Sequence, residues 1–321
     1  MRAVTFTGAG GNEVIAVAER PDPVPAAGEV LVAVRFAGLN WADVSQRQGH
    51  YPPPPGAPQD IPGLEVAGVV TATGGAVQAW RVGDRVFGLV GGGGLADRVA
   101  VHERHVTAIP GNLAEDIAAA VPEAYITAHD AVFTQCGLEM GETLLVNGAN
   151  GAVGSAGARL GLAAGARVVA NVRSPDSAST LAGEGAIVVT PAGAADEVAA
   201  LGGADVVLEL IGAPNLDFDF GALARKGRIV IVGTTAGEQG GISLRTLMGK
   251  RATLRGTMLR ARPLEEKAAA VQAFARSVVP LLAAGRALPE IDRVFPAAEA
   301  TAAFDHLVKP GKTGKILLEF T

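Results

Sequence analysis

Cysteine is almost absent from this chain of 321 residues, and aromatic side chains are also scarce, with 2 tryptophans and 2 tyrosines. The single cysteine excludes an internal disulfide framework and a zinc site made of several cysteines. A formal net charge of −5 argues against a nucleic-acid-binding surface, which would be basic. No apolar run approaches the length of a membrane span, and no signal segment is recognisable. We therefore expect a soluble, cytoplasmic protein.

Several common kinds of catalytic site are missing as well. The motif Gly-x-Ser-x-Gly of many hydrolases does not occur. The five histidines are not spaced with carboxylates as metal ligands would be. Cys136 lacks a nearby pair of basic residues that would favour a thiolate, so we expect a small buried hydrophobic side chain there. The sequence therefore contains no candidate metal site.

Two kinds of segment divide the chain. Short β segments separated by Gly and Pro fill the first third, which predicts an antiparallel, partly closed β domain. From about residue 118, runs rich in Val and Ile alternate with Ala-rich helical stretches, as in a parallel sheet buried on both faces. The expected strands of the second kind are residues 144–147, 167–172, 186–190, 206–211 and 228–233. The last residues return to short mixed elements, so we expect them to rejoin the first domain.

The turn of residues 148–154 lies between an apolar strand and a helix of small residues, and it carries glycine at Gly148, Gly151 and Gly154. Glycine allows the backbone to turn tightly and to approach a pyrophosphate without a Cβ in the way. The helix that follows offers free N–H groups to the phosphate. We predict a dinucleotide-binding turn made of residues Gly148, Asn150, Gly151, Ala152, Val153 and Gly154.

The next strand is followed by Arg173 and Ser174, at the place where an NAD-selective domain carries an acidic residue for the ribose hydroxyl. A guanidinium beside a hydroxyl suits a 2′-phosphate, which favours NADPH over NADH. Alternatively, Arg173 is a solvated loop residue, and Asp176 is the acid. Two further turns, Ile211-Gly212 and Gly233-Thr234, end later strands, and we expect both to line the cofactor groove.

Five motifs in order resemble the medium-chain dehydrogenase/reductase superfamily. They are the stretch from Gly38 to Gly56, residues 62–68, residues 82–86, residues 122–127, and the glycine turn. Together they resemble the zinc-independent quinone oxidoreductases, and most closely the tumour-suppressor-inducible quinone oxidoreductase branch. The resemblance implies an α/β fold with a GroES-like, mainly antiparallel β domain in residues 1–118, completed by residues 286–321. Residues 119–285 would form a Rossmann domain with a doubly wound parallel sheet.

The resemblance also implies NADPH as cofactor and a homodimer. Where the zinc-dependent alcohol dehydrogenases of this superfamily hold their metal with cysteine and histidine, this chain has Asn40 and Leu64. Neither side chain replaces a thiolate or an imidazole in a tetrahedral zinc site. We therefore expect no metal, and we read Glu65 as structural, with a functional role as the alternative.

Without a metal, the substrate carbonyl must be activated by hydrogen-bond donors. Tyr51 opens a proline-rich loop, and in related metal-free enoyl reductases a tyrosine at this position is the proton donor. The alternative is a loop tyrosine packed on prolines. Asn40 is the second candidate catalytic residue, and its alternative role is to stabilise a turn.

Four more residues are assigned to the cofactor by resemblance. Thr127 matches a position near the nicotinamide, although it would also pack as an ordinary helix residue. Met258, Leu259 and Arg260 resemble the segment that covers the nicotinamide ring, with a surface position as the alternative for Arg260.

The expected function is NADPH-dependent, zinc-independent hydride transfer to a conjugated carbonyl, with a quinone as the first choice of substrate. A 2-enoyl or alkenal reductase, or a tailoring reductase of a biosynthetic pathway, is the second hypothesis. A non-catalytic NADPH-binding sensor is the third.

Overall fold

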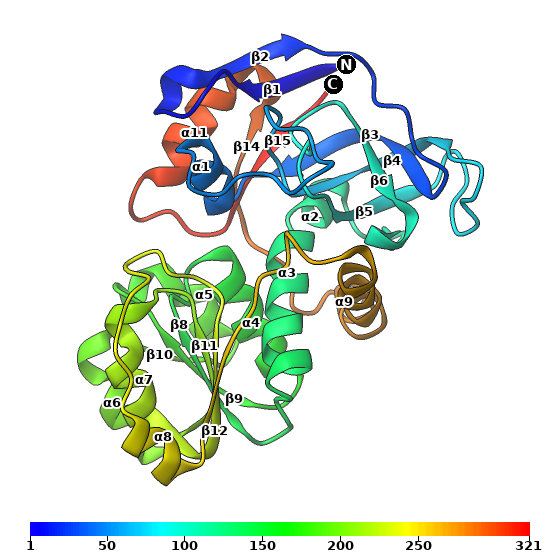
Figure 1. Ribbon diagram of the computed structural model, residues 1–321. Coiled ribbons are helices and arrows are strands. Elements are labelled where there is room, and N and C mark those ends of the chain that lie inside the picture. Colours follow the sequence, from blue (N-terminus) through cyan, green and yellow to red (C-terminus); the bar gives the residue numbers. More distant parts are fainter. The chain divides into compact units, whose positions relative to one another are not determined.

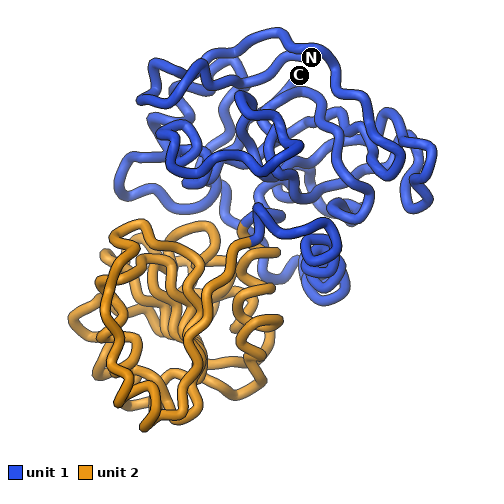
Figure 2. Tube along the Cα trace, in the orientation of Figure 1, with its two compact units in different colours: residues 1–123, 259–321 blue, residues 124–258 orange.

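The computed structural model describes all 321 residues and divides them into two compact units (Figure 2). Unit 1 contains residues Met1–Glu123 and Leu259–Thr321, and unit 2 contains Ala124–Met258. Unit 1 is therefore discontinuous, because its second segment follows unit 2 in the chain. The two ends of the chain lie close together within it, and Arg2 Nη2 donates to the carbonyl of Thr321 at 3.1 Å (Figure 1).

A seven-stranded mixed sheet forms the centre of unit 1. Its order is β14-β15-β3-β4-β5-β7, with β6 also paired to β3, and a separate hairpin is made of β1 and β2. All pairs are antiparallel except β14 with β15. The strands are β1 Arg2–Phe6, β2 Ile15–Glu19, β3 Glu29–Gly38, β4 Glu65–Thr73, β5 Arg85–Leu89, β6 Arg98–His102, β7 Val106–Ala108, β14 Ile291–Pro296 and β15 Lys315–Glu319. Because β15 pairs with the end of β3, the last strand of the chain reaches the neighbourhood of Asn40.

The α-helices of unit 1 cover parts of this sheet and fill its core. They are α1 Trp41–Arg47, α2 Glu115–Ala119, α9 Leu264–Ser277, α10 Val279–Ala283 and α11 Ala300–Val308. Short 3₁₀ turns are η1 Asn12–Val14, η2 Glu103–His105 and η6 Ala297–Glu299. Phe304 of α11 is completely buried and meets Phe6 edge-on, with ring centroids 5.8 Å apart.

The segment expected to end the Rossmann domain packs differently from the expectation. Residues 259–285 belong to unit 1, so unit 2 ends at Met258 rather than at residue 285. The physical reason is Phe274 of α9, which is fully buried against Phe87 of β5 at a centroid distance of 6.1 Å. The expected single helix is also divided into α9 and α10, with Pro280 in the first turn of α10.

Unit 2 is built on a six-stranded sheet whose strands are all parallel, in the order β10-β9-β8-β11-β12-β13. The strands are β8 Thr143–Asn147, β9 Arg167–Asn171, β10 Ile187–Val189, β11 Ala204–Glu209, β12 Leu223–Ile231 and β13 Thr253–Gly256. Its helices are α4 Ala152–Ala163, α5 Ser179–Gly183, α6 Pro191–Ala200, α7 Leu216–Ala222 and α8 Leu244–Lys250, with the 3₁₀ turns η4 Pro175–Ala178 and η5 Ala213–Asn215. The helix α3 Pro122–His129 starts at the boundary and continues into the π-helix η3 Asp130–Gln135.

Alternate residues of the parallel strands pack on opposite faces, which explains their continuous apolar character. Leu144 and Val146 belong to a core cluster with α4 and α5, whereas Leu145 belongs to a second cluster with α6 and α7. Figure 1 shows helices on both faces of this sheet. The expected fold class, a doubly wound Rossmann sheet with a GroES-like β domain, is confirmed. The strand order reverses between β8 and β11, where ligands of such sheets bind beyond the carboxyl ends of the strands.

The helices are too short or too polar for a bilayer, so none qualifies as a membrane-spanning segment.

Candidate functional site

The turn after β8 contains three glycines, and the backbone geometry requires glycine at two of these positions. Gly148 has a φ of +80°, and a Cβ on Gly154 would lie 2.3 Å from the carbonyl oxygen of Gly148. Both are therefore demanded by the turn itself. A Cβ on Gly151 would meet nothing closer than 3.4 Å, so the packing of the chain does not require glycine there. A bare backbone at Gly151 is useful for a ligand that approaches the turn.

The amino terminus of α4 follows this turn. Gly151 precedes the helix and has no side chain to cap it. The N–H groups at the start of α4, from Ala152 and Val153 onward, lack acceptors in the preceding turn of helix, because an α-helix satisfies its amides only from the fourth residue on. The turn and the helix terminus thus fit a pyrophosphate, since the donors and the helix dipole favour negative charge.

Arg173 and Ser174 follow β9 and are both exposed. The guanidinium of Arg173 makes no hydrogen bond or ion pair, so it is available to a phosphate. The carbonyl of Ser174 accepts from Ser177 Oγ at 2.6 Å, which begins the short 3₁₀ turn η4. Asp176 is exposed in the same turn. Both the expected phosphate ligand and its alternative therefore lie at the same loop.

The structure brings the other two expected cofactor turns to the same edge. Gly212 has a φ of +107°, and it forms a bridge with Gly237, in the segment that follows Gly233 and Thr234. A Cβ on Gly148 would lie 3.0 Å from Ile211 Cδ1, so the glycine turn adjoins the Ile211-Gly212 turn. The carboxyl ends of β8, β11 and β12 therefore carry one group of loops.

A buried polar network below these loops was missed by the sequence analysis. Asn147, Asn171 and Glu209 are the last residues of β8, β9 and β11, and Asp219 reaches them from α7. Asn171 Nδ2 donates to Asn147 Oδ1 at 2.9 Å, and Asn147 Nδ2 donates to Glu209 at 2.6 Å. A polar residue at the end of each of three apolar strands is the sequence signal that points to this network.

The four residues assigned near the nicotinamide have different surroundings. Thr127 in α3 is buried, and its Oγ1 has no hydrogen-bond partner in the protein. A buried hydroxyl without a partner is costly, and a ligand at this position would satisfy it. Met258 is exposed and ends unit 2, whereas Leu259 and Arg260 are buried in unit 1.

Arg260 is neither a surface residue nor free to cover a ligand. Its guanidinium donates to the carbonyls of Gly91 and Tyr51, at 2.9 and 3.1 Å, and to Gln46 Oε1 at 2.6 Å. It also lies 4.9 Å from the centre of the Tyr51 ring. All these partners belong to unit 1. The geometry makes Arg260 the residue that holds the Tyr51 loop.

Tyr51 is half-buried over this guanidinium. Burial, together with the negative charge of Glu123, raises the pKa of Tyr51 to about 12, although the charge of Arg260 acts in the opposite direction. The hydroxyl therefore remains protonated at physiological pH and is a hydrogen-bond donor there.

Asn40 is engaged on both sides of its amide. Its Nδ2 donates to Glu65 Oε1 at 2.9 Å, and its Oδ1 accepts from Lys315 Nζ at 2.5 Å. Lys315 Nζ also lies 2.5 Å from Glu65 Oε1, and both charged side chains are buried. Gly38 is needed because a Cβ there would lie 2.2 Å from Glu65 Oε1. The amide of Asn40 is thus turned toward this ion pair.

Two more carboxyls, which the sequence analysis did not single out, complete this cluster. Asp43 accepts from the N–H of Asn40 at 2.8 Å and from the N–H of Gly63 at 2.9 Å, and burial raises the pKa of Asp43 to about 6. The N–H of Glu123 donates to Glu65 Oε2 at 2.8 Å, and burial raises the pKa of the Glu123 side chain to about 7. A charged residue inside an otherwise apolar segment was the available signal for Glu123, whereas the polar segment around Asp43 gave no such signal.

The side chain of Asn40, at the position where the resemblance locates a zinc ligand of other superfamily members, contacts the ammonium group of Lys315. Leu64 is completely buried. The ammonium group of Lys315 contacts Asn40 Oδ1 and Glu65 Oε1. No group of three or more His, Cys, Asp or Glu side chains is arranged to hold a metal ion.

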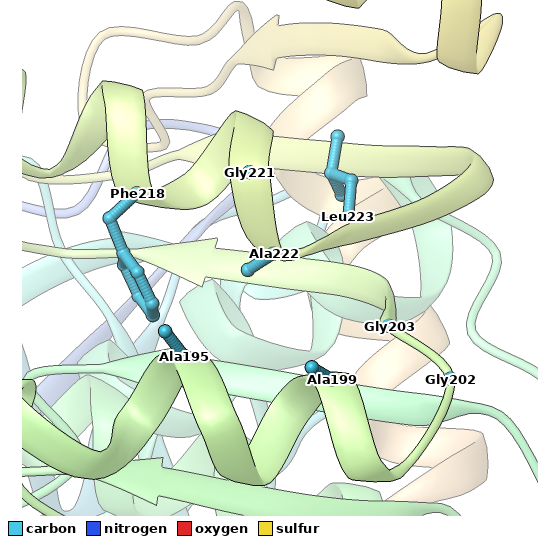
Figure 3. Close-up of a pocket in the computed structure, with 8 residues that line it drawn as sticks. All are labelled: Ala195, Ala199, Gly202, Gly203, Phe218, Gly221, Ala222 and Leu223. Carbon is cyan, nitrogen blue, oxygen red and sulfur yellow. The ribbon is translucent and has the colours of Figure 1, made fainter.

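A shallow pocket of about 460 Å³ lies elsewhere in unit 2, between α6 and α7 (Figure 3). Its lining residues are Ala195, Ala199, Gly202, Gly203, Phe218, Gly221, Ala222 and Leu223. Gly203 and Leu223 stand at the amino ends of β11 and β12, the edge opposite to the glycine turn. Its side chains bear no polar group, so it offers no chemistry.

The buried Lys315–Glu65 pair gives a stability prediction. The substitution Lys315→Met leaves the carboxylate of Glu65 buried without a cation, and we expect it to lower the free energy of unfolding by about 3–5 kcal/mol. Arg35→Met, which breaks the more exposed pair with Glu319, is the control, with an expected loss below about 1 kcal/mol. Urea unfolding measures both, and equal losses in the two variants would contradict the prediction.

Comparison with known proteins supports the same organisation. Residues 26–111 match the model of the alcohol dehydrogenase GroES-like domain, and residues 152–276 match that of the zinc-binding dehydrogenase family. A quinone oxidoreductase of Lama guanicoe is 30% identical over 327 residues, which cover 99% of this chain and 97% of that protein.

Solved structures are similar over the whole chain. The quinone oxidoreductase from Thermus thermophilus, which was also solved in complex with NADPH, is 34% identical with a TM-score of 0.85, and the match covers 100% of both chains. The CurK enoyl reductase is 25% identical with a TM-score of 0.85 over 100% of this chain and 99% of that chain. The chain therefore belongs to the medium-chain dehydrogenase/reductase superfamily, among relatives that are quinone oxidoreductases.

Proposed function

We propose that this protein is an NADPH-dependent, zinc-independent reductase that acts on conjugated carbonyl compounds, with quinones as the preferred class. The observation that carries the proposal is the ammonium of Lys315, bound to Asn40 and Glu65 where a zinc-dependent relative would bind its metal. With a lysine in that place, activation of the carbonyl falls to a hydrogen-bond donor. We place this chain, on its sequence motifs, in the tumour-suppressor-inducible branch of the quinone oxidoreductases.

The loops at the carboxyl ends of the parallel strands would hold the cofactor. Gly148, Gly151 and the start of α4 would bind the pyrophosphate, and Arg173 with Ser174 would bind the 2′-phosphate. The turns at Ile211-Gly212 and Gly233-Thr234 would line the groove, and the Thr127 hydroxyl would gain the partner that it lacks in the protein. When bound, NADPH supplies the hydride.

Tyr51 would activate the acceptor. Its hydroxyl stays protonated because its pKa is raised, so it can donate to a carbonyl oxygen on which negative charge develops. Arg260 would fix the Tyr51 backbone and ring in place. Asn40 would have a positioning role and not a direct one in the reaction, because both ends of its side-chain amide are hydrogen-bonded, to Glu65 and to Lys315.

Two other functions remain as outcomes of the tests below. A 2-enoyl or alkenal reductase would use the same hydrogen-bond donor, because an enolate also carries negative charge on oxygen. A non-catalytic NADPH-binding sensor would bind the cofactor and oxidise none of it.

We also propose a cytoplasmic homodimer. The edge strand β13 leaves one side of the six-stranded sheet unpaired. The helix that precedes β13 in the chain, α8, carries two exposed apolar side chains, Leu244 and Met248. An open strand edge beside apolar side chains favours pairing with another chain.

An acceptor screen tests the proposed function. We expect absorbance of NADPH to fall when the protein is mixed with 1,4-benzoquinone, and to fall more slowly with a crotonyl thioester. The opposite order would identify an enoyl reductase. Binding of NADPH without oxidation by any conjugated acceptor would favour the sensor.

Replacing Tyr51 with phenylalanine tests the proton donor. We expect Tyr51→Phe to lower kcat by about 10²-fold, in the range that a general acid contributes, with little change in NADPH affinity. Tyr125→Phe is the matched control, because it removes a hydroxyl from the only other tyrosine, which is fully buried in unit 2. A kcat for Tyr51→Phe within a few fold of the wild type would remove Tyr51 from the chemistry.

Arg173→Ala tests the choice of cofactor. Loss of a charge-assisted hydrogen bond to phosphate should weaken NADPH binding by roughly tenfold or more and leave NADH binding unchanged. Arg167→Ala, at the other end of the same strand, is the control. Fluorescence titration with both nucleotides measures the affinities, and an unchanged ratio in Arg173→Ala would exclude Arg173 as the 2′-phosphate ligand.

A further inference from the structure

We propose that Glu209 and Asp219 share one proton, and that this pair positions the Ile211-Gly212 turn, so that binding of the cofactor depends on the shared proton. The inference rests on the proposed function, because the turn's ligand is taken to be the nicotinamide cofactor. It concerns two residues of unit 2 that take no part in the hydride-transfer step described above.

The two carboxyls are forced together by one amide group. Asn147 Nδ2 donates to Glu209 Oε2 at 2.6 Å and to Asp219 Oδ1 at 2.7 Å. All three side chains are completely buried. Two carboxyls that meet at one nitrogen, away from water, cannot both ionise without a large cost.

An unpaired oxygen of Asp219 indicates that this carboxyl carries the shared proton. Oδ2 of Asp219 is buried and has no hydrogen-bond partner. With a proton on Asp219, this carboxyl becomes a donor toward Glu209, and the missing interaction is made. Burial and the neighbouring charge of Glu209 both raise the pKa of Asp219, in agreement with a protonated group at neutral pH.

The elements that pack against α7 supply no cation that would neutralise the negative charge of Glu209 and Asp219. Lys250 of α8 donates to the carbonyls of Gly221 and Leu223, and Arg228 of β12 pairs with Glu142. The remaining charged residues of these elements make no ion pair or hydrogen bond with either carboxyl. They are Asp196 and Glu197 of α6, Asp217 of α7, Arg245 of α8, and Arg225 and Lys226 of β12. Protonation is therefore the way in which the pair is neutralised.

Glu209 connects the pair to the cofactor edge. Its Oε1 accepts from the N–H of Ile211 at 2.5 Å and from the N–H of Gly212 at 2.7 Å, while Oε2 faces Asn147 and Asn215. These two bonds hold the turn at Gly212, whose φ of +107° is strained for other residues. Loss of the proton would place two negative charges side by side, and their repulsion would displace the carboxylate that holds the turn.

Binding of NADPH at different pH values tests the coupling. Fluorescence titration between pH 7 and 10 should show wild-type affinity falling by roughly threefold or more. Asp219→Asn keeps a donor toward Glu209 and cannot titrate, so we expect a flat profile with near wild-type affinity at pH 7. Asp217→Asn, on the exposed side of the same helix, is the control and should follow the wild type. An Asp219→Asn profile that parallels the wild type would overturn the inference.

A second measurement does not depend on the cofactor. Because the pKa of Asp219 is raised in the folded protein, the folded state keeps a proton that the unfolded state releases. The free energy of unfolding should therefore fall as pH rises above the ordinary range of aspartate, and level off once the pair has lost its proton. The fall should be smaller in Asp219→Asn than in the wild type and in Asp217→Asn.

The two experiments separate the two failures. If the wild type binds neither NADPH nor NADH at any pH, the proposed function is wrong. If urea unfolding of Asp219→Asn has the same pH dependence as the wild type, the shared proton is wrong, whatever the protein binds.

Discussion

A charged or polar group that is removed from water must find its partners inside the protein, and both candidate sites are organised by this constraint. In unit 1 the carboxylate of Glu65 is completely buried and is matched by the ammonium of Lys315 and the amide of Asn40. Gly38 leaves room for that carboxylate, and Glu123 supplies a backbone N–H to it. Strands β4 and β15 are thereby connected through their side chains, although each pairs in the sheet with β3 and not with the other.

The same constraint in unit 2 has a different solution. Asn147, Asn171 and Glu209 end three neighbouring strands without any cation, so amides and a shared proton must satisfy the network. The network supports the loops above it through Glu209, which holds the turn at Gly212. A buried polar site is therefore built at the carboxyl ends of strands whose central residues, such as Leu145 and Val207, are apolar and buried.

Arg260 shows how such pairing shapes a candidate active site. Resemblance places this residue near the nicotinamide, but its guanidinium is used by Gln46, Gly91 and Tyr51. A buried guanidinium needs several acceptors, and the carbonyls of two loops provide them. The consequence is a rigid position for Tyr51, which is what a donor to the substrate requires.

Local patterns in the sequence determined most of the secondary structure, because alternating or continuous apolar runs identify strands that are buried on one face or on two. The turn at Gly148 was also predictable, since Gly148 and Gly154 serve backbone geometry that is local to the turn. By contrast, α1 and β13 were not expected, as their short sequences carry little periodicity.

Only the tertiary structure decided which distant residues meet. Lys315 lies 250 residues from Glu65 in the chain, and strand pairing between β15 and β3 places it there. Residues 259–285 joined unit 1 because Phe274 packs on Phe87, a contact that no local pattern reveals. The sequence by itself therefore determined the family, most of the helices and strands, and the glycine turn. The pairing of buried charges, and with it the role of Asn40, Arg260 and Glu209, depended on long-range packing, because a charge is satisfied by proximity in space and not by its neighbours in the chain.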